Sequence, residues 1–463
     1  MTTARRVKHP TLGEGILLKS IMGGYIWEVK FASGQRYRLH SHEFEAESIH
    51  AHIPTHNGYH PVPPPPQTDQ FLNRQTLEAL RAGVVPIKQV KDLTIGLEAE
   101  QTSLDRAIAR ALEHGGEAMA VIADYGFGKS HFVELTAQKA LEKNFLVANT
   151  SLDLVEVPPG KAREIYRSLI ASLRYPDHDE GGLKPLLQKA LESPHQLGAF
   201  VNRSPIDDCP LCLALESLSL CDNAQAAEDI AYWLSAQIKP TAAMRQFFKK
   251  PPPLYVNGEV ARQYAYLLTA ISALAASLGY AGLVVLIDES EHYSLLKTAQ
   301  RERADAFFKA LIHAAMGPSA SLIDPETIPN HLRADYPVNF TDDAHLLFLF
   351  ASTESESRMP VEVWLTPSQV VRLDNRFLKE DIDKFLKMVL RYHSVAFDYR
   401  NPSKERYQNL LRETSALLSR SLKNRQINIR ELIRLAVTIC DLMYVHQDYD
   451  PNRLQRELEK GLA

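Results

Sequence analysis

The residues that could carry out chemistry are concentrated in Ala123–Ser130, which reads Ala-Asp-Tyr-Gly-Phe-Gly-Lys-Ser. The apolar run 118–122 precedes it, and a segment with apolar residues at helical spacing follows it. A glycine-rich turn between a strand and a helix presents backbone N–H groups that bind phosphate. In such a loop Lys129 neutralises the β and γ phosphates and Ser130 holds Mg²⁺. The sequence therefore predicts a nucleotide-binding loop made of Ala123, Asp124, Tyr125, Gly126, Phe127, Gly128, Lys129, Ser130 and His131.

A pair of acids, Asp288 and Glu289, follows a second apolar run at 283–287. Such a run is typical of a buried parallel strand, which delivers both acids at its carboxyl end. In a phosphate-loop ATPase the first acid orients Mg²⁺ and the second activates the attacking water. Each motif alone has a simpler explanation, a chance Lys-Ser after a turn or a buried strand that surfaces at two acids. Together they indicate ATP hydrolysis with Mg²⁺.

Length and composition set the limits within which these motifs operate. The chain has 463 residues, 45% of them apolar, and a formal net charge of −4, which suits two or three domains with proper cores. So mild a charge offers no basic field, and any contact with nucleic acid needs a local patch. We expect no membrane span and no signal peptide. Four cysteines in so long a chain favour a reducing compartment, the cytoplasm.

The sequence predicts four parts along the chain, which together must position these residues. Residues 1–48 form a small β-module with alternating apolar residues, and 49–70 form a linker rich in histidine and proline. Residues 71–375 form an α/β core with a central parallel sheet and a helical insertion at about 176–260. Residues 376–463 form a helical lid, and the segments 370–373 and 378–390 are expected to begin it.

A zinc site is a minor alternative within the insertion. Cys209, Cys212 and Cys221 are close in sequence, and His195 is the nearest fourth ligand. A structural zinc site needs four ligands at suitable spacing. The stretch after Cys212 has the pattern of an amphipathic helix, which explains these residues without a metal.

The first 48 residues are similar to SH3-like or Tudor-like modules. The similarity rests on Val7-Lys-His-Pro-x-Leu-Gly-Glu-Gly15 and on Val29-x-Phe-x-x-Gly34. Such a module implies a barrel that docks another protein or nucleic acid. A barrel whose aromatic residues only fill its core explains the alternation equally well.

The chain from about residue 74 onward resembles the ATP-binding proteins of bacteriophage-exclusion (BREX) systems. Four segments carry the resemblance: 78–86, 93–98, 125–130 and 162–169. It implies antiviral defence in a bacterium, with the ATPase acting as a switch or loader for a helicase or other DNA-acting partner. Double-stranded DNA is a further candidate ligand, and ATP-dependent homo-oligomerisation is expected.

The same region is similar to initiator-type AAA+ ATPases, which implies a P-loop NTPase core of the α/β class. In that family an element before the phosphate loop packs on adenine, and Ile95 and Gly96 stand at its place. Ser352 or Thr353 corresponds to sensor 1, beside the γ phosphate. Arg430, rather than Arg425, corresponds to sensor 2, although a solvated helix arginine is the alternative. An arginine finger from another subunit has three open candidates, Arg358, Arg372 and Arg376.

Two other functions remain open. A nucleotide-gated adaptor would bind ATP with little hydrolysis and bridge protein partners. A DNA-translocating motor acting alone is disfavoured by the weak net charge and by the lack of helicase motifs. DNA-stimulated turnover would favour the motor, and tight ATP-dependent partner binding with slow turnover would favour the adaptor.

Overall fold

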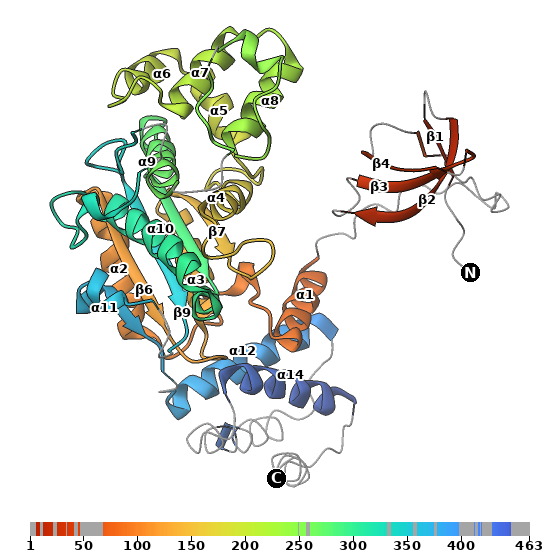
Figure 1. Cartoon of the computed structure of the whole chain (residues 1–463). Helices are drawn as coiled ribbons and strands as arrows, with labels where there is room; N and C mark the ends of the chain where they lie inside the picture. The colour runs from red at the N-terminus through yellow and green to blue at the C-terminus, as the bar shows by residue number, and fades with distance from the viewer. Residues whose placement is uncertain are drawn as a thin grey trace. The chain divides into compact units, whose positions relative to one another are not determined.

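The chain divides into two compact units, Met1–Pro66 and Gln67–Ala463. The computed structural model shown in Figure 1 describes residues 6–9, 13–21, 26–33, 35–40, 45–46, 68–248, 250–255, 260–330, 335–354, 359–374, 377–397, 412, 415–416, 418 and 428–445. Most of the predicted His- and Pro-rich linker lies outside the described residues. No helix in these ranges is both long and apolar enough to cross a bilayer.

The first unit contains a five-stranded antiparallel sheet in the order β4-β3-β2-β1-β5. Val29 and Phe31 are buried, as the alternation along this segment predicts. Gly15 lies opposite Phe31, and a Cβ there would come within 2.7 Å of Val29 Cγ1. The β-rich prediction is thus confirmed as an antiparallel sheet, and its closure into an SH3-like barrel stays a prediction. The strands are β1 (Arg6–His9), β2 (Gly13–Ile21), β3 (Ile26–Phe31), β4 (Arg36–His40) and β5 (Glu45–Ala46).

The second unit is built on a five-stranded parallel sheet in the order β10-β6-β9-β8-β7. Strands β6, β8 and β9, inside the sheet, are mostly apolar because helices cover both faces, whereas the edge strand β7 ends in Asn-Thr-Ser. This mixed α/β architecture confirms the predicted central parallel sheet and is consistent with a P-loop core. The strands are β6 (Gly116–Ile122), β7 (Leu146–Ser151), β8 (Leu283–Asp288), β9 (Leu346–Ser352) and β10 (Val370–Arg372).

Strand β10 corrects the prediction that Val370–Leu373 begins the helical lid. Val370 pairs with Ala120 and Arg372 with Ile122, in parallel with β6. Two successive valines favour extended backbone, and Val371 is buried in the core. The tertiary pairing with β6 therefore turns this short segment into the edge strand.

Helices form a layer on each face of the sheet, as Figure 1 shows. On one face α2 (Glu98–Glu113) and α3 (Lys129–Glu142) pack on Met119 and Val121. On the other face Ala118 and Ala120 meet the second layer. Adjacent residues of a strand point to opposite faces, so β6 contributes to both cores. The second layer consists of α4 (Ala162–Ala171), α9 (Ala261–Ser277) and α10 (Thr298–Met316).

The described part of the predicted insertion contains four short helices. Their buried residues extend the hydrophobic core that α4, α9 and α10 form on the second face of the sheet. They are α5 (Lys184–Leu191), α6 (Pro194–Val201), α7 (Pro210–Leu220) and α8 (Ala224–Leu234). Cys209 and Cys212 form a disulfide at the start of α7, whereas Cys221 caps its far end, 11 residues later. An α-helix of that length holds Cys221 away from the other two sulfurs. The described residues contain no group of three His, Cys, Asp or Glu side chains that could hold a metal ion.

A third core joins α1 (Asp69–Ala82) to α12 (Lys379–Phe397) and α14 (Ile429–Val445). Leu77 and Leu80 of α1 are buried among apolar residues of the other two helices. Arg81 also contacts Asp441 at 2.9 Å. Among the described residues, α1 thus packs with α12 and α14, in a cluster separate from the sheet. The remaining elements are η2 (Ile87–Gln89), η3 (Met244–Gln246), η4 (Ser290–Leu295), η5 (Pro325–Thr327), α11 (Val361–Trp364) and η6 (Pro367–Gln369).

Candidate functional site

Three strands deliver their carboxyl ends to one edge of the parallel sheet. Ile122 of β6 lies opposite Ser352 of β9, and β8 ends beside them at Asp288. Ligands of open α/β sheets bind outside the carboxyl ends of the strands. A cavity of about 430 Å³ opens at this edge, and it is lined by residues of the predicted phosphate loop and acid pair.

The loop after β6 has the backbone that its glycines allow. Gly126 and Gly128 have φ of +82° and +90°, in the left-handed region that favours glycine. A Cβ on Gly128 would meet no atom within 4 Å, whereas one on Gly126 would lie 3.0 Å from Asn428 Cγ. Helix α3 begins at Lys129, so its first N–H groups lack partners within the helix and favour an anion.

Lys129 is buried, with 7% of its side chain exposed. Its ammonium group donates to the carbonyl of Ala123 at 3.2 Å, to that of Asp124 at 3.4 Å and to Thr353 Oγ1 at 2.9 Å. Ala123 and Asp124 are not among the described residues that line the cavity. They contribute backbone oxygens to the lysine, and Thr353 connects β9 to it.

Ser130 and Asp288 line the same end of the cavity. The backbone N–H of Glu289 donates to Asp288 Oδ1 at 2.8 Å. Burial raises the pKa of Asp288, while the neighbouring Ser130 hydroxyl acts in the opposite direction. A hydroxyl and a carboxylate are oxygen donors of the kind that Mg²⁺ takes. The pair that the sequence assigned to the metal therefore fits it.

A third acid, Glu291, completes the group. Glu289 has φ of +58°, and burial together with Glu291 and Asp288 raises its pKa. Glu291 Oε1 accepts a hydrogen bond from Thr353 Oγ1 at 2.8 Å and lies 3.6 Å from Lys129 Nζ. Glu291 is thus the carboxylate beside the Lys129 ammonium group, and Asp288 and Glu289 interact with that group electrostatically. Glu291 was not predicted as a site residue, although the run Asp-Glu-Ser-Glu signals a third acid.

The other end of the cavity is apolar. Ile95 lies there as predicted, but Gly96 is not among the described lining residues, and a Cβ on it would meet Phe377 Cδ1 at 2.9 Å. The segment from Gly83 to Ile87 forms one wall that the sequence analysis did not assign to the site. An apolar Val-Val-Pro directly after a helix is the signal that could have found it. The apolar lining consists of Leu80, Val84, Val85, Pro86, Ile87, Leu93, Ile95, Leu97, Val133, Phe377, Phe385, Ile429 and Ile433.

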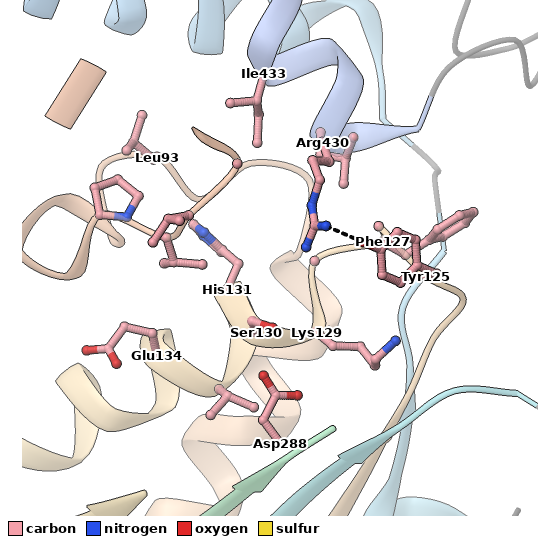
Figure 2. A pocket seen from close by; sticks show the side chains of 18 of the residues that line it. Leu93, Tyr125, Phe127, Lys129, Ser130, His131, Glu134, Asp288, Arg430 and Ile433 are labelled. Atoms are coloured by element: carbon pink, nitrogen blue, oxygen red, sulfur yellow. Dashed lines mark hydrogen bonds between the residues drawn. The ribbon is translucent and has the colours of Figure 1, made fainter. Parts of the chain in front are cut away.

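His131 lies between the two ends (Figure 2), and its ring contacts Thr94. Thr94 Oγ1 is 2.7 Å from the carbonyl of Val90 and 2.8 Å from His131 Nε2. The hydroxyl has one proton, which the carbonyl requires, so Nε2 must be the donor to Thr94. Burial lowers the pKa of His131 to about 4. The ring is therefore neutral at pH 7, with its proton on Nε2.

Arg430 reaches the cavity from the start of α14, and Figure 2 shows it extended toward the phosphate loop. Its Nη1 donates to the Tyr125 hydroxyl at 2.6 Å. Arg372, one candidate for the arginine finger, is exposed and binds Glu362 at 3.0 Å and also Glu354. Arg358, Arg376 and Arg425 lie outside the described residues.

Comparison with known proteins identifies a family. A model of the family described as BREX system ATP-binding protein BrxC/D matches residues 70–197 and 215–323, just over half of the chain. The matched stretches include the phosphate loop, His131 and all three acids of the site. The first unit, strand β9 and the lid helices α12 and α14 lie outside them. No curated protein matches the sequence.

Proposed function

Because the chain belongs to the family of BREX system ATP-binding proteins BrxC/D, we propose that it binds ATP with Mg²⁺ in this cavity and hydrolyses it. The observation that carries the proposal is the meeting of Lys129, the Ser130–Asp288 pair and Glu289 at one edge of the sheet. These groups supply a cation for the phosphates, oxygen ligands for a metal and a carboxylate for a water. Phosphoryl transfer needs this combination.

The two ends of the cavity suit the two ends of ATP. The apolar end, with Ile95, Pro86 and Ile433, supplies contacts for a purine base. Neutral His131 lies between this end and the loop, and its unprotonated Nδ1 can accept a hydrogen bond. The phosphate end has the start of α3, where Gly128 leaves the approach to the backbone open.

Each residue has a defined part in the proposed reaction. Ser130 and Asp288 would hold Mg²⁺, which when bound neutralises charge on the β and γ phosphates. Glu289 polarises a water molecule for in-line attack on the γ phosphorus, and the bond from that phosphorus to the bridging oxygen breaks to release ADP. The raised pKa of Glu289 makes it a better proton acceptor near neutral pH. Lys129 stabilises the charge that develops on the phosphate oxygens.

The biological role that we propose is a switch or loader for a DNA-acting partner, such as a helicase, in bacterial defence against phage. The family description supports ATP binding within a BREX system. The lid contact from Arg430 to the phosphate loop supports a conformational output, because nucleotide and lid would then compete for the same groups. ATP-dependent self-assembly, in which a neighbouring subunit contributes an arginine, belongs to the same proposal.

The deciding experiment measures ATP hydrolysis and solution mass with and without ATP, for the wild-type chain and for Glu289→Gln. We expect turnover in the wild type, and binding without turnover in the variant, because the amide cannot accept the proton. Normal turnover by Glu289→Gln would remove the assigned role of Glu289. Tight ATP binding with no turnover in the wild type would instead identify a nucleotide-gated adaptor, and no ATP binding would overturn the proposal.

A further inference from the structure

Lys129, Thr353 and Glu291 form a closed cluster at the phosphate end of the cavity. Thr353 Oγ1 lies 2.9 Å from Lys129 Nζ and 2.8 Å from Glu291 Oε1, and the two charged groups are 3.6 Å apart. The three residues follow different strands: Lys129 opens the helix after β6, Glu291 lies in η4 after β8, and Thr353 comes directly after β9. Only the assembled sheet edge brings them together.

The hydrogen-bond donors of this cluster are fully used. An ammonium group has three N–H bonds, and Lys129 directs them to Ala123, Asp124 and Thr353. The single proton of Thr353 goes to Glu291, because a carboxylate only accepts and an ammonium only donates. A phosphate oxygen can therefore bind Lys129 only if the lysine gives up one of these partners.

Glu291 also competes with phosphate for the charge of Lys129. Its side chain is 21% exposed and that of Lys129 is 7% exposed, so water screens the pair only partly. When the lysine turns to a phosphate group, Glu291 is left near Asp288, Glu289 and a further anion. Its Oε2 is buried and has no hydrogen-bond partner among the described residues, whereas its Oε1 accepts a hydrogen bond from Thr353.

We propose that Glu291 is a positioning residue that holds Lys129 and Thr353 in the nucleotide-free site and yields the lysine to the γ phosphate when ATP binds. The inference rests on the proposed nucleotide site and adds a residue to it. As a competing anion, Glu291 lowers the affinity for nucleotides and lowers it more for ATP than for ADP.

The variant that tests this is Glu291→Gln, which keeps an oxygen acceptor for Thr353 and removes the negative charge. We expect it to bind ATP about tenfold more tightly than the wild type, with a smaller gain for ADP, by isothermal titration calorimetry in EDTA and again with Mg²⁺. Glu291→Asp, whose carboxylate is withdrawn by one methylene group, should lie between the two. The matched control is Glu326→Gln, an exposed acid in η5, which changes the net charge equally and should leave both affinities unchanged.

The outcomes separate this inference from the proposed function. If the wild type binds ATP and both Glu291 variants bind it no more tightly than the wild type, Glu291 does not compete with phosphate for Lys129. The proposed nucleotide site would still stand. If Glu291→Gln keeps wild-type affinity but stops hydrolysis, Glu291 is the water-activating acid and the positioning role is overturned. If the wild type binds no nucleotide, the proposed function itself fails. Should Glu291→Gln fail to fold, the ATP-to-ADP affinity ratio of Glu291→Asp decides alone.

Discussion

Arg430 of the lid helix α14 donates a hydrogen bond to the Tyr125 hydroxyl at 2.6 Å, and its guanidinium carbon lies 4.9 Å from the centre of the Tyr125 ring. The side-chain stem of Arg430 also packs on Gly83, whose left-handed backbone ends helix α1. One arginine thus connects the lid, the end of α1 and the phosphate loop. Tyr125 is 64% exposed, so the bond contributes little to stability and is easily exchanged.

Breaking this contact from its two sides should change ATP affinity in opposite directions. If Arg430 leaves Tyr125 for the γ phosphate, Tyr125→Phe removes a competitor and should tighten ATP binding by about two- to fivefold. Arg430→Ala removes the phosphate ligand and should weaken it by about tenfold or more. Both are measured by titration calorimetry. The control is Arg434→Ala. Arg434 lies one turn further along α14 and donates a hydrogen bond to the carbonyl of Ala82, so its removal should leave the ATP affinity unchanged. Equal weakening in both test variants would mark the contact as purely structural.

Lys129→Ala should abolish nucleotide binding, with at least a hundredfold loss of ATP affinity, because Lys129 is the cation at the start of α3, whereas Arg430 reaches the cavity from the lid helix α14. Fluorescence anisotropy of a labelled ATP analogue measures the loss. Lys139→Ala is the matched control, since Lys139 lies on the same helix and binds Asp105 at 2.7 Å. Retained affinity in Lys129→Ala would show that the nucleotide binds elsewhere.

Adding one methyl group should have opposite effects at Gly96 and Gly198. Gly96 has φ of +62°, and a Cβ there would meet Phe377 Cδ1 at 2.9 Å, so Gly96→Ala should cost about 1–3 kcal/mol of unfolding free energy. Gly198 lies within α6, and a Cβ there would meet nothing within 4 Å. Gly198→Ala should therefore stabilise the chain by about 0.5–1 kcal/mol. Denaturant titration measures both, and equal effects would contradict the assigned backbone strain.

Acid should weaken the packing of α1, α12 and α14 through His393. Its ring is fully buried and its Nε2 donates to Asp441 Oδ1 at 3.0 Å. Burial lowers the pKa of His393 and outweighs the opposing effect of Asp441, while Arg81 adds to the lowering. The unfolded chain therefore binds more protons below its own pKa of about 6.5, and the stability that neutral His393 contributes is lost as the pH falls from there.

The measurement is the difference in unfolding free energy between the wild type and His393→Gln from pH 8 to 5. Groups that titrate alike in both proteins cancel in this difference. We expect the wild-type advantage to be constant above pH 7 and to shrink below it. An advantage that grows on acidification would mean that the pKa of His393 is raised in the folded chain.

Much of the parallel core could be predicted from local patterns. The runs before Ala123 and after Gly282 are apolar on both faces, which requires burial in a covered sheet, and both form parallel strands. Val370–Leu373 was misplaced because three or four residues carry too little periodicity, and pairing with β6 decided its conformation. Helix α1 has an ordinary amphipathic pattern, and nothing in that pattern says that its apolar face meets α12 and α14.

For the site, local sequence patterns were enough to predict the residues that act locally: the glycines that shape the loop, the lysine and serine that open a helix, and the acids that end a strand. These follow from short-range rules of backbone geometry and hydrophobic periodicity. The tertiary structure alone decided which of them meet. The contact of Thr353 with Lys129 and Glu291, and of Arg430 with Tyr125, spans long stretches of chain. Such contacts depend on strand order and helix packing, which no local pattern encodes.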